Sequence, residues 1–178
     1  MIRLMLTLMT MLLLTCAGVC QTEPPSQNGR VAPADWPTYT DKTYPFKIKY
    51  PKSFVILSEP ARLPEAAPHI KYRVRFQDKY LAAGETARLE PPQFSIEVLE
   101  NERSLNLRDW LASAVHVGAE DSVEPFHLDG AGEGLRVRYA MQLAPNEFYF
   151  FARGKYIFKL TPLGQYSEEM LNSFRLNS

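Results

Sequence analysis

Three histidines are the first residues that could contribute acid–base or metal chemistry. His127 and Asp129 are two positions apart, so both side chains would lie on one face of a strand. Two ligands are fewer than a zinc site needs. His116 precedes Glu120 by four positions, but Gly118 between them favours a helix end, where a cation is favourable. We predict surface positions for these residues, with no metal ligand and no cofactor.

A glycine-rich run, "DGAGEG" at 129–134, could cradle a phosphate. Its spacing differs from the dinucleotide-binding pattern, and it leads into a strand where that pattern needs a helix. We predict a turn between two strands. The sequence contains no G-x-S-x-G, H-E-x-x-H or Walker pattern. We predict no catalytic residue and a protein that is not an enzyme; the alternative is a hydrolase or other enzyme whose site has no recognised motif.

Seven cations alternate with apolar residues in three segments. On a strand this alternation puts the apolar residues toward a core and the cations on the opposite face. If the strands are neighbours, the cations form a basic face that would bind an anionic partner, such as phospholipid headgroups or an acidic glycan. The alternative is a solvated face whose cations pair with acids such as Glu97 and Glu100, or are covered by a helix. The cations are Lys47, Lys49, Lys71, Arg73, Arg75, Arg136 and Arg138.

Composition limits the class of protein. The chain has 178 residues, of which 46% are hydrophobic and 22% charged, which suits one compact domain. The formal net charge is zero, so nothing indicates a nucleic-acid partner.

The first twenty residues have the pattern of an export signal. Arg3 precedes an uncharged apolar stretch that is short for a membrane span and is followed by small residues. Both cysteines, Cys16 and Cys20, lie here, so the rest of the chain can form no internal disulfide. Cys20 resembles the acylation site of bacterial lipoproteins, with Cys16 as the lesser candidate, although Val19 stands where a small residue is usual.

This resemblance implies an exported chain in the bacterial cell envelope or periplasm, held to a membrane by an N-terminal lipid. A cleaved signal and a soluble secreted protein is the alternative. Residues 21–35 are rich in Pro, Gln and Ser, which predicts a flexible linker. A single domain is expected over 36–178.

The sequence of this domain has the residue pattern of an antiparallel sheet. The segment "FKIKY", with prolines at both ends, predicts a first, edge-like strand. Two segments instead have helical spacing: 105–117, capped by Ser104 or Asn106, and 167–175, capped by Ser167. Trp36 and Trp110 are expected to fill core positions or seal an edge, and not to stack on a ligand. The six predicted strands are 46–50, 70–76, 94–98, 135–143, 147–152 and 156–162. The last three should form an antiparallel meander. The predicted fold is α+β, with about six mainly antiparallel strands in one sheet packed by helices.

Three stretches carry a family resemblance: "WPTYTDKTYPFKIKYPKSF", "GAGEGLRVRY" and "EEMLNSFRL". They resemble the small PsbP/Mog1-like proteins, which include many bacterial lipoproteins of undetermined role. The resemblance covers roughly 36–177 and implies a sandwich of sheet and helices, but no reaction. The expected function is that of a non-catalytic binding module that engages a protein or an anionic envelope component.

Overall fold

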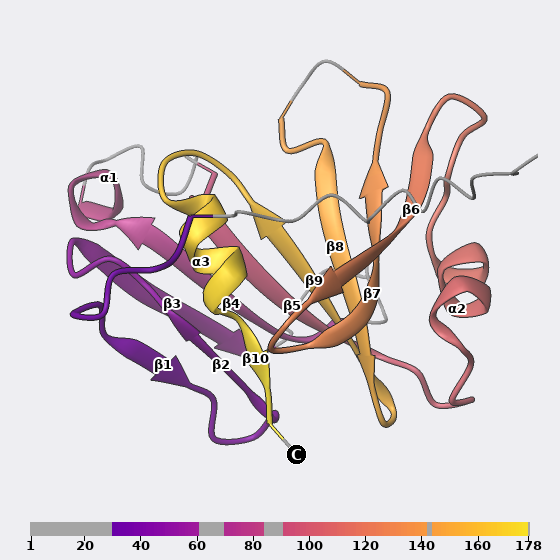
Figure 1. Ribbon diagram of the computed structural model, residues 1–178, viewed down its shortest axis with the longest axis horizontal. Coiled ribbons are helices and arrows are strands. Elements are labelled where there is room, and N and C mark those ends of the chain that lie inside the picture. The colour runs from indigo at the N-terminus through magenta and orange to yellow at the C-terminus, as the bar shows by residue number, and fades with distance from the viewer. Residues whose placement is uncertain (1–29, 61–69, 84–90, 142–143, 178) are drawn as a thin grey trace, which may run out of the picture.

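The computed structural model describes residues 30–60, 70–83, 91–141 and 144–177. Its centre is a curved antiparallel sheet of seven strands in the order β3-β4-β5-β9-β8-β7-β6 (Figure 1). The strands are β3 (Phe54–Pro60), β4 (Ile70–Asp78), β5 (Phe94–Glu100), β6 (Ser122–Leu128), β7 (Gly132–Arg138), β8 (Glu147–Arg153) and β9 (Tyr156–Pro162). The predicted α+β class and the antiparallel meander β7-β8-β9 are confirmed.

A second sheet of three strands was not predicted. It has the order β1-β2-β10, formed by β1 (Thr38–Thr40), β2 (Phe46–Lys49) and β10 (Arg175–Leu176). The predicted first, edge-like strand is therefore wrong in both respects. It is β2, the second strand of the chain and the central strand of the small sheet, because β1 and β10 pair with its two sides.

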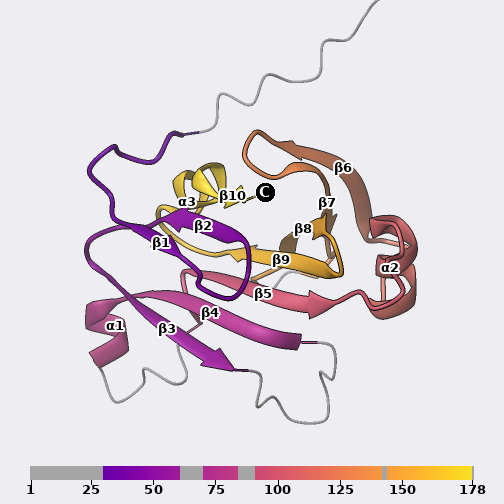
Figure 2. The same ribbon diagram turned by 90° about the horizontal axis from the view of Figure 1, so that it is seen from below.

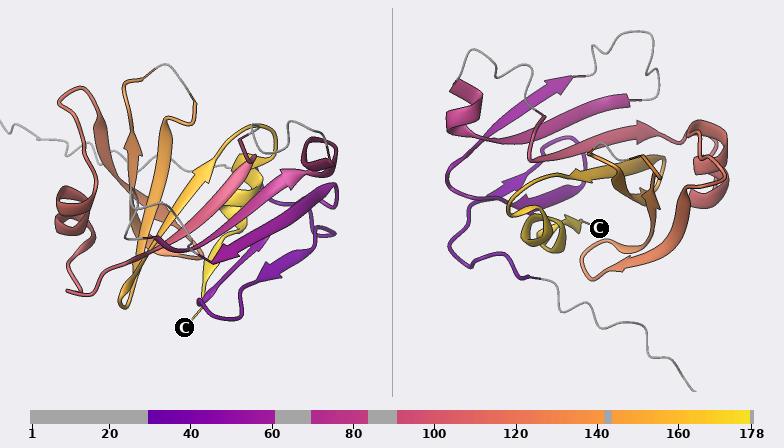
Figure 3. Two further views of the ribbon diagram at one scale, coloured as in Figure 1. Left: turned by 180° about the vertical axis from the view of Figure 1, so that it is seen from behind. Right: turned by 90° about the horizontal axis from the view of Figure 1, so that it is seen from above.

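Two layers cover the main sheet on opposite faces. The small sheet and α3 (Ser167–Ser173) lie on the concave face, whereas α2 (Leu107–Ala114) lies on the other face near β7 and β8 (Figures 2 and 3). A short helix that was not predicted, α1 (Lys79–Ala83), follows β4. The wide core between the main sheet and the small sheet is rich in buried aromatic rings: Phe46, Phe76, Phe94, Phe151, Phe158 and Phe174.

The predicted helices exist but are shorter than expected. Asn106 caps α2 by accepting a hydrogen bond from the Asp109 amide, as predicted, but α2 ends at Ala114, before Gly118. The residue that precedes α3 is Tyr166, in the left-handed conformation at φ 67°, so the predicted Ser167 cap is wrong. Trp110 of α2 is buried in a second, smaller core between α2 and the main sheet, as expected. Trp36 is half-buried and packs against the core between the two sheets.

All core residues among the described part of the chain lie at or after Ala32. A chain that begins at Gln21 therefore keeps every strand, every helix and both cores that the structure describes.

Candidate functional site

A groove of about 290 Å³ opens on the outer side of the small sheet, where β2 and β10 meet the end of α3. Three of the described residues that line it are cations, three carry a hydroxyl or amide, and none is acidic. The lining residues are Val31, Ala32, Thr38, Lys47, Lys49, Asn172, Ser173 and Arg175. We call this the cationic groove.

The buried side of the small sheet explains why the cations face outward. Phe46 and Ile48 are fully buried on β2, and Leu176 of β10 packs against the same core. Because side chains alternate along a strand, Lys47, Lys49 and Arg175 occupy the opposite face. The outward orientation predicted for Lys47 and Lys49 is confirmed, since Lys47 is exposed and Lys49 half-exposed.

The register of the small sheet puts like charges side by side. Lys47 of β2 lies directly opposite Arg175 of β10, and its partner on β1 is Thr40. Lys49 lies opposite Thr38. Like charges in direct cross-strand positions destabilise a sheet, whereas a bound anion would remove the repulsion.

Local hydrogen bonds fix the groove's inner wall. The Ser173 hydroxyl accepts from the Lys49 amide at 2.9 Å and donates to the Met170 carbonyl at 2.7 Å. Arg175 Nη1 donates to the carbonyls of Asn172 and Phe174 at 2.6 and 2.8 Å. The guanidinium is thereby oriented, and it carries further N–H donors on Nε and Nη2.

The start of the described chain lies beside the groove. The Arg30 carbonyl accepts from Asn172 Nδ2 at 3.0 Å, and the Arg30 amide donates to Glu168 Oε1 at 3.2 Å. The Arg30 guanidinium is 3.8 Å from Glu169. The acids of α3 are therefore in contact with Arg30, while Val31 and Ala32 continue into the groove wall.

The other predicted cations lie elsewhere. Lys71, Arg73 and half-buried Arg75 are on β4, and Arg136 and Arg138 are on β7. β5, β9 and β8 separate these two strands, and both belong to the main sheet. The seven cations therefore do not form one continuous face.

On the main sheet, two cations of neighbouring strands face one acid in register. Arg73 lies opposite Glu97, which in turn lies opposite Lys159 on β9. Arg73 Nε donates to Glu97 Oε1 at 2.7 Å and Lys159 Nζ donates to Oε2 at 3.0 Å. Burial opposes ionisation of Glu97, but the two cations outweigh it and lower the pKa of this carboxyl. This row of charges has a structural role.

The predicted alternation of faces along β4 is wrong at its start, around Lys71. The register shifts between Ile70 and Tyr72, so that Ile70 packs against the core under α2, and Tyr72 against the core under the small sheet. Such an irregularity changes the face on which a side chain lies. Lys71 Nζ lies 2.5 Å from Glu100 Oε2. The alternative that named Glu97 and Glu100 as partners is thus confirmed for Arg73 and Lys71.

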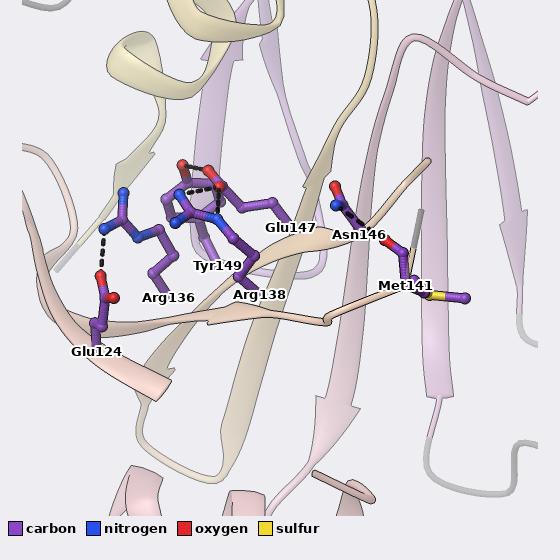
Figure 4. Close-up of polar contacts among 7 residues, drawn as sticks. All are labelled: Glu124, Arg136, Arg138, Met141, Asn146, Glu147 and Tyr149. Atoms are coloured by element: carbon purple, nitrogen blue, oxygen red, sulfur yellow. Dashed lines mark hydrogen bonds and ion pairs between the residues drawn. The ribbon is translucent and has the colours of Figure 1, made fainter. Parts of the chain in front are cut away.

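Arg136 and Arg138 are paired in the same way (Figure 4). Arg136 lies opposite Glu124 of β6 and bonds to it, and Arg138 lies opposite Glu147 of β8, with Nε 2.9 Å from Oε2. Tyr149 also donates to Glu147. The arginine lowers the pKa of Glu124, and burial raises that of Tyr149. Each of these cations has an acidic partner, whereas Lys47 has none among the residues that the structure describes.

The remaining candidates form no comparable site. His127 lies 2.7 Å from Glu133 and 3.7 Å from Asp129, all three exposed around the β6–β7 turn that "DGAGEG" forms. Among the described residues, no group of three or more His, Cys, Asp or Glu is arranged to hold a metal.

A smaller hollow of about 220 Å³ beside α2 is lined by acids, Arg103 and Trp110. Its buried Asn101 is bonded to the Leu105 backbone and so holds the loop.

Sequence reasoning missed Arg175, Ser173 and Asn172 as part of the site. It extended the last helix through 175, whereas the helix ends at Ser173 and Arg175 begins a strand. The signal was the alternation of buried Phe174, outward Arg175 and inward Leu176, which is a strand pattern.

The chain matches no protein-family model, and no curated protein is significantly similar to it in sequence. None of the helices in the described ranges is long and apolar enough to cross a membrane. Cys16 and Cys20 lie outside the described residues.

Proposed function

We propose that this protein is a non-catalytic binding module of the cell envelope that holds an anionic envelope component in the cationic groove. One observation carries the proposal. Lys47 and Arg175 face each other in register, with Lys49 on the same face and no acid among the described lining residues. On the main sheet, by contrast, Arg73, Arg136 and Arg138 each lie opposite an acid.

The donor set suits phosphate or carboxylate. An arginine presents a planar fork that matches both groups, and lysines add compact point charges. Thr38 adds a hydroxyl at the same face. Binding by such a site should weaken as salt rises, because added ions screen exposed charges.

Two broader expectations belong to the same proposal. The α+β class, the buried aromatic β2 and the closing α3 support a PsbP/Mog1-like domain. Export, with acylation of Cys20 or, less favoured, Cys16, is supported by the apolar leader and the Pro-rich segment that follows. The proposed location is the bacterial envelope or periplasm, with lipid anchoring; a soluble secreted form is the alternative.

The test uses a chain that begins at Gln21, together with Lys47→Gln/Lys49→Gln and a control, Lys79→Gln/Lys155→Gln. Both variants lose two positive charges, but the control lysines are exposed outside the groove. Titration calorimetry with glycerol 3-phosphate and with polygalacturonate gives the affinities at low salt. Because two of three groove cations are lost, we expect at least tenfold weaker binding of one of these anions for the groove variant, and native affinity for the control.

Unfolding in urea should show that the groove variant is at least as stable as the native chain, since the substitution removes a like-charge pair. Equal weakening by both variants would mean that only net charge matters. No binding of either anion by the native chain would reject the proposal.

A further inference from the structure

We infer that the cationic groove docks on phosphate groups of anionic lipids in the same membrane that holds the chain's N-terminus. This inference rests on the proposed function and names the occupant. Four observations support it: where the chain enters the domain, how far it can reach, what surrounds the groove and how large the groove is.

The chain enters the domain at the groove itself. Arg30 is held to α3 through Asn172 and Glu168, and the next two residues, Val31 and Ala32, are part of the groove wall. Ala32 is buried, so this entry point is fixed to the folded body. An anchor on the N-terminal side of Arg30 is therefore connected to the domain at the cationic groove, and not at the opposite end of the domain.

Covalent geometry limits the distance from the anchor. Arg30 lies ten positions after Cys20 in the chain. A fully extended chain covers at most about 3.6 Å per residue, so Arg30 lies within about 36 Å of an acylated Cys20. This is close to the diameter of a small domain. The groove, which lies beside Arg30, therefore stays within reach of the lipid surface when the chain is anchored.

The groove's surroundings combine charge with an exposed apolar side chain. Val31 is 84% exposed and lies in the groove wall with Lys47, Lys49 and Arg175. Apolar side chains next to cations are typical of segments that contact the interface of an anionic membrane. Each Lys or Arg near such a surface contributes attraction that decays within a Debye length.

The size of the groove favours a headgroup over a larger ligand. Its volume of about 290 Å³ is at the lower limit of small-molecule sites, which measure roughly 300–1,000 Å³. A lipid phosphate with its glycerol fits this volume and can approach without entering the core. A soluble acidic glycan could use the same donors, but the position of the anchor would give it no advantage.

The experiment measures vesicle binding by sedimentation for the chain that begins at Gln21, which has no anchor. Vesicles contain either phosphatidylcholine alone or an equal mixture with phosphatidylglycerol, and glycerol 3-phosphate and polygalacturonate serve as soluble competitors. We expect binding to the anionic vesicles alone. Lys47→Gln/Lys49→Gln should weaken it about 30-fold, from ~1 kcal/mol per cation, and Val31→Ser should weaken it further. The control Lys79→Gln/Lys155→Gln should weaken it less than threefold.

The outcomes separate this inference from the proposed function. If the groove binds a soluble anion but the native chain does not bind anionic vesicles, the lipid-docking inference is wrong. The proposed function, anion binding in the cationic groove, is then still supported. If vesicles bind equally well to the native and groove-variant chains, docking uses another surface and the inference is wrong. If neither vesicles nor soluble anions bind, both proposals fall.

Discussion

At the scale of single residues, the protein uses its strand cations in two ways. Arg73, Arg136 and Arg138 lie opposite acids and form ion pairs that hold strands in register. Lys47 lies opposite Arg175 and Thr40 instead. The first arrangement stabilises the sheet, whereas the second costs stability. Such a cost is expected if the groove is the proposed binding site.

Glu97 is the residue on which the main-sheet charges depend. Its side chain is only 8% exposed and bridges Arg73 and Lys159. Glu97→Gln would leave two cations facing a neutral amide, so we expect the free energy of unfolding to fall by about 3 kcal/mol, the lower end for a broken buried pair. Urea unfolding measures this. The exposed control Glu120→Gln should change it by less than about 0.5 kcal/mol; equal effects would show that Glu97 is not a bridge.

The same carboxyl predicts how stability depends on pH. The folded protein lowers the pKa of Glu97 below its ordinary value of 4.5. A lowered folded pKa stabilises above the unfolded pKa, and this contribution disappears as pH falls through the folded pKa. The stability difference between native and Glu97→Gln chains should therefore be constant near neutral pH and shrink below about pH 4.5. A difference that stays constant down to pH 3 would contradict the assignment.

At the scale of elements, alternation in the sequence predicted most strands and the inward and outward faces of β2. It could not predict that β2 leaves the main sheet, because the pairing of β2 with β10 joins segments more than 120 residues apart. β1 has three residues and β10 two, which is too short for a periodic signal. The cationic groove depends on this pairing, so sequence identified two of its cations and missed the third.

Close packing between β7 and β8 gives a prediction about an element. A Cβ added at Gly134 would lie 2.5 Å from the Phe150 carbonyl and 2.7 Å from the buried Phe151 ring. Because backbone cannot move aside cheaply, Gly134→Ala should lower the free energy of unfolding by about 1–3 kcal/mol.

Gly118→Ala is the matched control, since the nearest atom to its Cβ would be a side-chain oxygen of Asp121 at 3.3 Å. Its unfolding should stay close to that of the native chain. A larger loss at Gly118 than at Gly134 would contradict the packing of the meander.

At the scale of the whole molecule, the proposed arrangement is an anchor, a short connecting segment and a domain whose cationic groove lies next to the segment's end. Acylation holds a chain at a membrane because buried methylenes add about 0.8 kcal/mol each and several chains act together. The groove would then act over a short distance from the lipid surface.

This arrangement predicts the fate of the full chain in a bacterial host. The native chain and Cys16→Ser should partition into the detergent phase and carry an acylated N-terminus by mass spectrometry. Cys20→Ser should move to the aqueous phase, because it removes the attachment sulfur. A native chain in the aqueous phase without a modified cysteine would mean that the leader is simply cleaved.

The central claim is that an anion binds where β2, β10 and the end of α3 meet, and amide NMR tests it without any substitution. The chain that begins at Gln21 is titrated with phosphatidylglycerol headgroup phosphate, as glycerol 3-phosphate, at low salt. The account predicts that the largest shifts map to the amides of Thr38, Lys47, Lys49, Ser173 and Arg175, and that they diminish as salt is added. Shifts centred on Arg136 and Arg138, or no shifts at millimolar phosphate, would contradict it.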